Sequence, residues 1–142
     1  MRKLRRHAPG TGRSRGQALV EFALVVPVFI LLVAGMIDFG FGLYSYMTLI
    51  SGAREGARLG VTNCSATNCS AAVTSKVQAS SSGLNPSVTV ACATAAGVAE
   101  ACTASTAGDS VTVTASYTYN MIWPLAFGTQ IPMASSVKMM LE

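Results

Sequence analysis

The stretch Arg15-Gly16-Gln17-Ala18-Leu19-Val20-Glu21-Phe22 decides the fold, because a basic segment ends in it and a long apolar run begins. A single acid, Glu21, lies at the start of that run. A charge inside a bilayer costs about 2.5–3.5 kcal/mol or more, so an acid placed there needs a partner. An α-amino group would serve, and a cut between Gly16 and Gln17 would create one four positions before Glu21.

The apolar run that follows is long enough to cross a membrane. No charged residue occurs between Phe22 and Ile37, and about 20 apolar residues span a hydrocarbon core of roughly 30 Å. We therefore expect one long helix over residues 17–60, with its membrane span at about 18–41. Pro27 removes one backbone hydrogen bond and is expected to bend or loosen this helix; simple tolerance of a membrane proline is the alternative.

These residues resemble a known family. The Gly16–Phe22 motif, followed by Pro27, by Asp38 and by the Ala-Arg-Glu-Gly-Ala-Arg stretch 53–58, is similar to the TadE-like family, minor pilins of the tight-adherence (Flp) pilus system. The resemblance covers about 45 residues, and the rest of the chain agrees with it only in general layout.

The resemblance implies a pilin-like fold and a role in assembly. A prepilin peptidase would cut after Gly16 on the cytoplasmic side. The new ammonium of Gln17 and the carboxylate of Glu21 would then pair between neighbouring subunits. The implied partners are this peptidase, other pilin or pseudopilin subunits, the pilus assembly machinery and membrane lipid.

The charge of the chain is confined to its N-terminal segment. Six of the ten basic residues precede Gly16, and the remainder has four bases against six acids, a formal charge of −2. Residues 1–16 are therefore predicted to be a disordered, cytoplasmic basic leader that is cleaved off, with Pro9, Gly10 and Gly12 discouraging a helix. A nucleic-acid surface would need bases spread over a folded face, so no nucleic-acid partner is expected.

Two features of the expected helix allow more than one interpretation. Asp38 is a membrane-boundary acid that is either solvated at the outer interface or paired with another subunit, and the sequence does not decide between these. Gly52, Gly56 and Gly60 form a face of small residues that permits close backbone approach. We expect this face to pack on the chain's own C-terminal sheet in preference to a neighbouring helix.

The four cysteines all lie beyond the apolar run. They are Cys64, Cys69, Cys92 and Cys102. Clustering in an exported part predicts two disulfides, and three pairings are open. Cys64–Cys69 with Cys92–Cys102 is favoured because each closes a short loop. A zinc site is the rival, but the spacings are not those of CxxC pairs and the single histidine, His7, lies in the leader, so no metal is predicted.

Residues 61–142 are predicted to form a small exported α+β domain. A loop over 61–70 and a short helix over 71–82 precede three antiparallel strands, at about 88–92, 111–118 and 134–141, where apolar and polar residues alternate. The connection between the last two strands carries Trp123 and Phe127. These aromatic side chains either form an exposed contact site or, as we expect, fold back over the sheet.

No catalytic constellation occurs in the sequence. Its acids show no paired spacing, and no phosphate-binding loop or nucleophile motif is present, so we expect neither an enzyme nor a cofactor nor a small-molecule substrate. The expected location is the inner membrane as a single-pass protein with its C-terminal domain outside, or in a surface pilus. Alternatives are an uncut envelope protein that binds a ligand or partner, a pseudopilin of a secretion machine, and a secreted protein cut near Val33-Ala34-Gly35.

Overall fold

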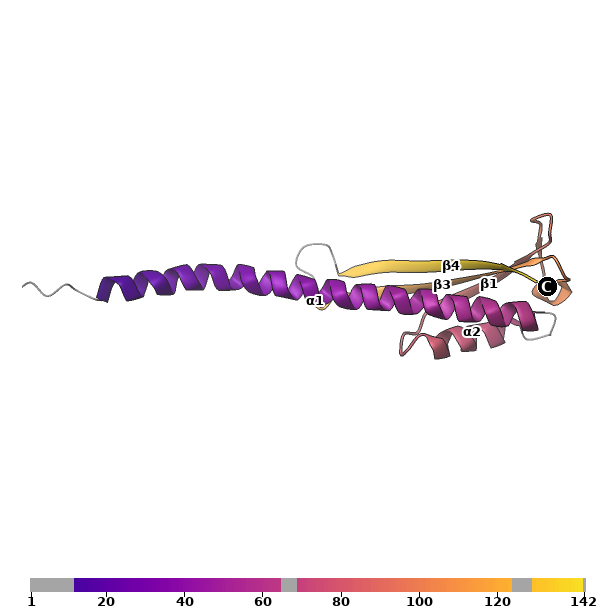
Figure 1. The fold of residues 1–142 in the computed structure, drawn as a ribbon, viewed down its shortest axis with the longest axis horizontal. Helices are drawn as coiled ribbons and strands as arrows, with labels where there is room; N and C mark the ends of the chain where they lie inside the picture. Colours follow the sequence, from indigo (N-terminus) through magenta and orange to yellow (C-terminus); the bar gives the residue numbers. More distant parts are fainter. Residues whose placement is uncertain (1–11, 65–68, 124–128, 142) are drawn as a thin grey trace, which may run out of the picture. The chain divides into compact units, whose positions relative to one another are not determined.

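The computed structural model describes residues 12–64, 69–123 and 129–141, with side chains from Gly16 onward. The chain divides into two compact units, residues 1–37 and 38–142. The long helix α1 (Gly12–Asn63) contributes to both units, and all other elements lie in the second. The long apolar helix followed by an α+β domain agrees with the predicted fold class (Figure 1).

The helix α1 is longer at both ends than the sequence indicates. It begins at Gly12 and ends at Asn63, against the predicted 17–60. The prediction of a disordered leader is therefore wrong for residues 12–16, because two glycines among Arg and Ser residues are too weak as helix breakers to stop an adjoining long helix. The rest of the leader, residues 1–11, lies outside the described residues. Pro27 lies within the continuous helix.

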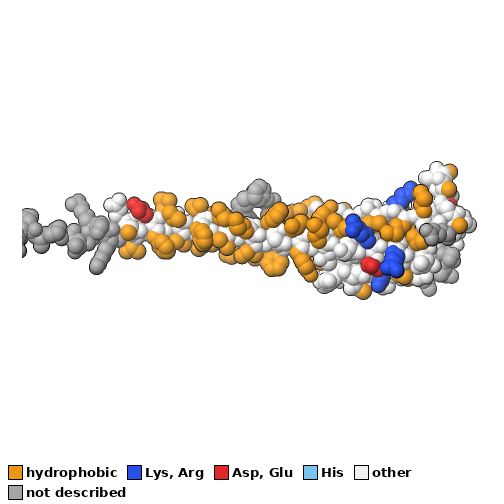
Figure 2. Space-filling model, viewed as in Figure 1, with side chains coloured by type: hydrophobic (Ala, Val, Ile, Leu, Met, Phe, Trp, Pro, Cys, Tyr) orange, Lys and Arg blue, Asp and Glu red, His pale blue; other side chains and the backbone are white. Residues whose placement is uncertain are grey.

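The apolar part of α1 in the first unit is almost entirely exposed. Leu24, Phe29 and Leu32 each expose half or more of their surface, and Figure 2 shows hydrophobic side chains along this stretch. Gly16–Asn63 is long and apolar enough, by length and composition, to cross a membrane. This agrees with the predicted anchor, since exposed apolar surface of this extent is unfavourable in water.

One face of α1 in the second unit contributes to the core. Its buried positions recur at helical spacing; they are Asp38, Gly42, Ser45, Leu49, Gly52, Ala53, Gly56, Ala57 and Gly60. The second helix, α2 (Cys69–Ser80), packs beside this face and buries Val73 and Val77 against it. The predicted helix over 71–82 is thus shifted by two residues.

The glycine face of α1 has two different partners. A methyl group built on Gly52 would lie 2.5 Å from the Ser81 hydroxyl oxygen, and one built on Gly56 would overlap the Val77 side chain. At Gly60 it would lie 3.0 Å from Cγ1 of Val111 in the sheet. The expectation of packing within the chain is confirmed, but the sheet is only part of the cover: α2 residues contact all three positions, and the sheet contacts only Gly56 and Gly60, through Val113 and Val111.

Gly56→Ala is expected to destabilise the second unit. Alanine favours a helix over glycine by about 1 kcal/mol, but overpacking against two valines costs typically 1–3 kcal/mol, so the net change is a loss of stability. Gly40→Ala is the matched control, because a methyl group there meets nothing within 4 Å and should be neutral or stabilising. Denaturant unfolding of both variants in detergent checks this, and equal stability would contradict the packing.

The sheet has four antiparallel strands in the order β2-β1-β3-β4. They are β1 (Ser87–Ala93), β2 (Ala99–Glu100), β3 (Ser110–Asn120) and β4 (Gln130–Met140). The prediction of three strands missed β2, which is too short to show any alternation and pairs only with Cys92 and Ala93. Val111, Val113 and Ala115 of β3 face the helices and are fully buried.

The strand β4 begins four residues earlier than predicted and includes Pro132 opposite Thr118. Proline has no N–H to donate, so it is confined to edge strands, and β4 is the edge of the sheet. The alternation over 134–141 correctly predicts most of this strand, but residues 130–133 were not predicted because proline is typical of a loop. Strand β3 also runs further, because Tyr119 and Asn120 keep pairing with Ile131 and Gln130.

Candidate functional site

The predicted cleavage site lies on the exposed surface of α1. Gly16, Gln17 and Glu21 are all helical and exposed, and a methyl group built on Gly16 would meet no atom within 4 Å. Among the described side chains, the one ion pair joins Lys76 to Glu55 at 4.0 Å, so none of those side chains neutralises Glu21. An exposed glycine one turn before an acid that no described side chain neutralises is accessible to an external partner.

Asp38 accepts hydrogen bonds from the end of β3 and from the connection that follows it. Its Oδ1 accepts a hydrogen bond from the backbone N–H of Ile122 at 2.9 Å, and its Oδ2 accepts one from the N–H of Trp123, also at 2.9 Å. The hydroxyl of Tyr119 donates a third, longer bond at 3.3 Å. Asp38 is only 8% exposed.

This geometry gives Asp38 partners that neither interpretation named. The buried carboxylate accepts hydrogen bonds at both oxygens from donors of its own chain. Burial of the Tyr119 phenol, with the negative charge of Asp38 beside it, raises the pKa of that tyrosine above its usual value, so it stays protonated and can donate. Asp38 thus ties the start of the β3–β4 connection to α1.

The aromatic connection does not fold back over the sheet at the residues that the structure describes. Ile122 and Trp123 expose 58% and 50% of their surfaces, respectively. The prediction of a covering loop is therefore wrong for Trp123, whose backbone is held by Asp38 while its side chain is left half in the open. Phe127 lies outside the described residues.

A second carboxylate, Asp109, joins three segments at the other end of β3. Its Oδ1 accepts a hydrogen bond from the N–H of Ala95 at 3.0 Å. Its Oδ2 accepts from the N–H of Thr106 at 2.6 Å and from the Thr106 hydroxyl at 2.9 Å. The backbone of Asp109 also accepts from Leu141, which follows β4. Sequence reasoning missed this role, although an Asp after Gly108 in a small-residue loop is a typical turn signal.

Asp109 is expected to make the fold sensitive to acid. The hydrogen bonds from Thr106, its backbone N–H first and its hydroxyl second, hold the Asp109 pKa below its usual value. The group thus contributes stability that is fully present above the unfolded-state pKa of about 3.9 and is lost as the pH falls through the lower folded pKa.

Asp109→Asn should remove that part of the pH dependence. Unfolding by denaturant, followed in detergent from neutral pH down to the acid transition, should give a shallower fall in stability for the variant than for the unchanged chain. Identical slopes below pH of about 4 would show that the carboxylate is not held as described.

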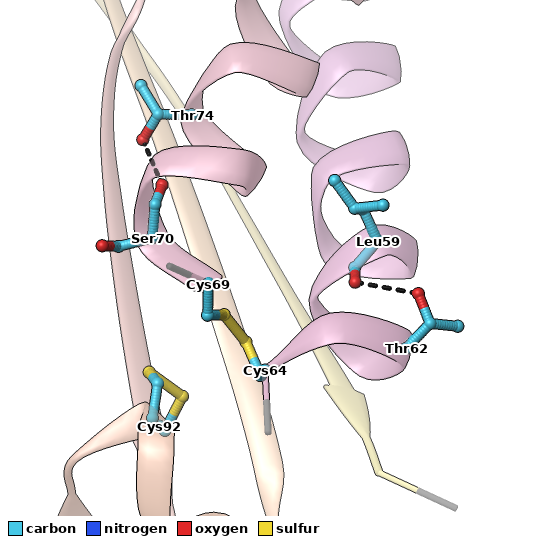
Figure 3. The surroundings of a disulfide bond; sticks show 8 residues. Leu59, Thr62, Cys64, Cys69, Ser70, Thr74 and Cys92 are labelled. Atoms are coloured by element: carbon cyan, nitrogen blue, oxygen red, sulfur yellow. Dashed lines mark hydrogen bonds between the residues drawn. A yellow bond between two sulfur atoms is a disulfide. The ribbon is translucent and has the colours of Figure 1, made fainter. Parts of the chain in front are cut away.

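The cysteines form two disulfides, Cys64–Cys69 and Cys92–Cys102, which is the pairing that the short loops favour. The first joins the end of α1 to the start of α2 (Figure 3). The second joins β1 to the short 3-10 helix η1 (Cys102–Ala104). Cys64, Cys69 and Cys92 are buried.

The two disulfides lie next to each other. The sulfur atoms of Cys64, Cys92 and Cys102 are all within 4.8 Å of one another. As disulfides these sulfurs have no thiolate to offer a metal ion. The first disulfide therefore ties the two helices to each other, the second ties β1 to η1, and the two covalent cross-links lie side by side.

Comparison with known proteins supports the family resemblance and adds nothing beyond it. Residues 16–58 match the family model described as "TadE-like protein". The matched range begins at Gly16, and it covers Glu21, Asp38 and the Gly52–Gly56 face of α1. No curated protein matches the chain, and no solved structure matches it.

Proposed function

We propose that this chain, whose residues 16–58 match the TadE-like family, is a minor pilin or pseudopilin that contributes to the assembly of a tight-adherence (Flp) pilus. The observation that carries the proposal is this match together with the exposed Gly16–Glu21 segment at its start. The proposed role is structural, with no catalysis and no cofactor. The domain over 61–142 is the exported part and the apolar helix is the inner-membrane anchor.

Processing by a prepilin peptidase is the first step of the proposed mechanism. The cut falls between Gly16 and Gln17, removes the basic leader and creates an ammonium on Gln17. Both residues are helical, so the peptidase has to unwind about one turn of the end of α1 to reach the peptide bond. A glycine at that position makes the unwinding easier, since glycine is among the weakest helix formers.

Charge pairing between subunits is the second step. The ammonium of Gln17 on one subunit and the carboxylate of Glu21 on the next attract each other by roughly 4 kcal/mol at 4 Å and an effective dielectric of 20, before desolvation is subtracted. The exposed apolar side chains of the same helix segment supply the surrounding contact area. The pairing selects one register among the many that a featureless apolar helix would allow.

N-terminal sequencing of the protein from membranes and from sheared surface material, with and without the peptidase, tests the processing. The proposal expects a start at Gln17 that depends on the peptidase. A start at Met1 both with and without the peptidase would favour an uncut envelope protein. A start at or beyond Gly35 would mean a secreted protein cut by ordinary signal peptidase.

Glu21→Ala tests the pairing separately from the processing. We expect this variant to be exported and cut normally but to be absent from sheared pili. Glu55→Ala is a matched control, because Glu55 is also an exposed acid on α1 but pairs with Lys76 of its own chain. Normal incorporation of the Glu21 variant would contradict the charge-pairing step while leaving the cleavage result intact.

A further inference from the structure

We propose that Ile122 and Trp123, which Asp38 holds, form a second membrane contact, in which the start of the β3–β4 connection sits in the lipid interface. The partner is the bilayer surface. The inference uses the membrane anchorage in the proposed function and is independent of cleavage and of the pilus.

The first step is where Asp38 holds these residues. Two backbone hydrogen bonds of 2.9 Å tie the N–H groups of Ile122 and Trp123 to the Asp38 carboxylate. Asp38 is the first charged residue after the uncharged run Phe22–Ile37, and the next charged residue along α1 is Arg54. The two side chains are therefore fixed at the level where the hydrocarbon-compatible part of the helix ends.

The second step is that other exposed aromatic side chains follow Asp38 along α1. Phe39 is 73% exposed, Phe41 54% and Tyr44 60%. The six helical steps from Asp38 to Tyr44 rise about 9 Å, which is comparable to one headgroup region of about 5–7.5 Å. Exposed tryptophan and tyrosine gather at membrane interfaces because their rings are apolar and their N–H and O–H groups still reach water or headgroups.

The third step is that the domain leaves these two side chains largely uncovered. Ile122 exposes more than half of its surface and Trp123 exposes half, whereas Tyr119, three residues before Ile122, is only 8% exposed. The Tyr119 ring is thus buried, while the side chains of Ile122 and Trp123 are exposed. Asp38 holds all three residues by hydrogen bonds. Burial of two such side chains in an interface recovers apolar area that the fold leaves exposed.

Trp123 is the single tryptophan of the sequence, so its fluorescence reports this contact directly. The full-length protein is reconstituted in phosphatidylcholine vesicles, and retention after alkaline carbonate extraction is measured first. Emission is then compared with lipids brominated near the headgroup, with lipids brominated near the chain end, and with aqueous iodide. We expect the lipids brominated near the headgroup to remove most of the emission, and iodide to remove little.

Val98→Trp in a Trp123→Phe background is the matched control. Val98 is 63% exposed and follows β1 at the end of the sheet where Ala93 pairs with Ser110, whereas Tyr119 and Asn120 mark the other end. Ten residues of β3 separate these ends by about 33 Å. The control tryptophan should be quenched by iodide and not by lipid.

Three results would overturn the inference. Quenching of Trp123 by iodide and not by lipid would place it in water. Protection from both quenchers would place it against protein, as a second copy of the chain would. Release of the protein from vesicles by carbonate would contradict the membrane anchor and therefore the proposed location. The extraction is measured before the fluorescence, so this failure is distinguished from the other two.

Discussion

Asp38→Ala is expected to release the Met121–Trp123 segment from α1. The variant loses the acceptor for two backbone N–H groups and for the Tyr119 hydroxyl at once. Loss of one hydrogen bond of ordinary strength to a charged group is enough for about tenfold faster amide exchange. We therefore expect the amides of Ile122 and Trp123 to exchange at least about tenfold faster, measured by hydrogen–deuterium exchange in detergent.

Two more conservative variants should accelerate amide exchange less than Asp38→Ala. Asp38→Asn keeps one acceptor oxygen but turns an amide donor toward the other N–H, so it should fall between the alanine variant and the unchanged chain. Tyr119→Phe removes only the 3.3 Å bond and should alter exchange least. Unchanged exchange at Ile122 and Trp123 in the alanine variant would mean that the loop is held by something other than Asp38.

Removal of one cysteine is expected to do more damage than removal of a disulfide pair. In Cys69→Ser, the Cys64 thiol is left within 4.8 Å of both sulfurs of the second disulfide. Its thiolate can attack the sulfur of Cys92 or Cys102, form a new bond to that atom and release the other cysteine as a thiolate. Peptide mapping by mass spectrometry should find Cys64 bonded to Cys92 or Cys102.

The double variant Cys64→Ala/Cys69→Ala is the control, because no attacking thiol remains. It should keep Cys92–Cys102 intact and lose only the stabilisation of one short loop, about 2 kcal/mol in the chain-entropy model. A free, unexchanged Cys64 thiol in the single variant would contradict the close approach of the two disulfides.

The local pattern of the sequence predicted most of the fold. The uncharged run Phe22–Ile37 indicated the long helix, and the alternation around Val111 and Val113 indicated the central strand, because both signals repeat over many residues. The strand β2 could not be predicted, since two residues have no period. The start of β4 was missed because Pro132 is typical of a loop unless the strand is known to lie at a sheet edge.

The proposed cleavage site rests on residues that are close in sequence. The spacing from Gly16 to Glu21 suggests it and the matched range begins at the same glycine, but the cut itself stays a prediction. The environment of Asp38 was not predictable, because its partners Ile122 and Trp123 are 84 and 85 positions away and donate from the backbone. Any residue except proline can donate a backbone N–H, so no sequence motif marks these donors.

That separation in sequence also orders events during synthesis. The ribosome makes Asp38 long before Ile122 and Trp123, so for most of translation the acid at the end of the apolar helix has no internal partner. In the membrane insertion proposed above, an aqueous surface is the favourable place for its charge during that interval, so the acid resists movement of the nascent helix deeper into the bilayer. Only after β3 has been made can the folded domain supply the donors that hold this charge.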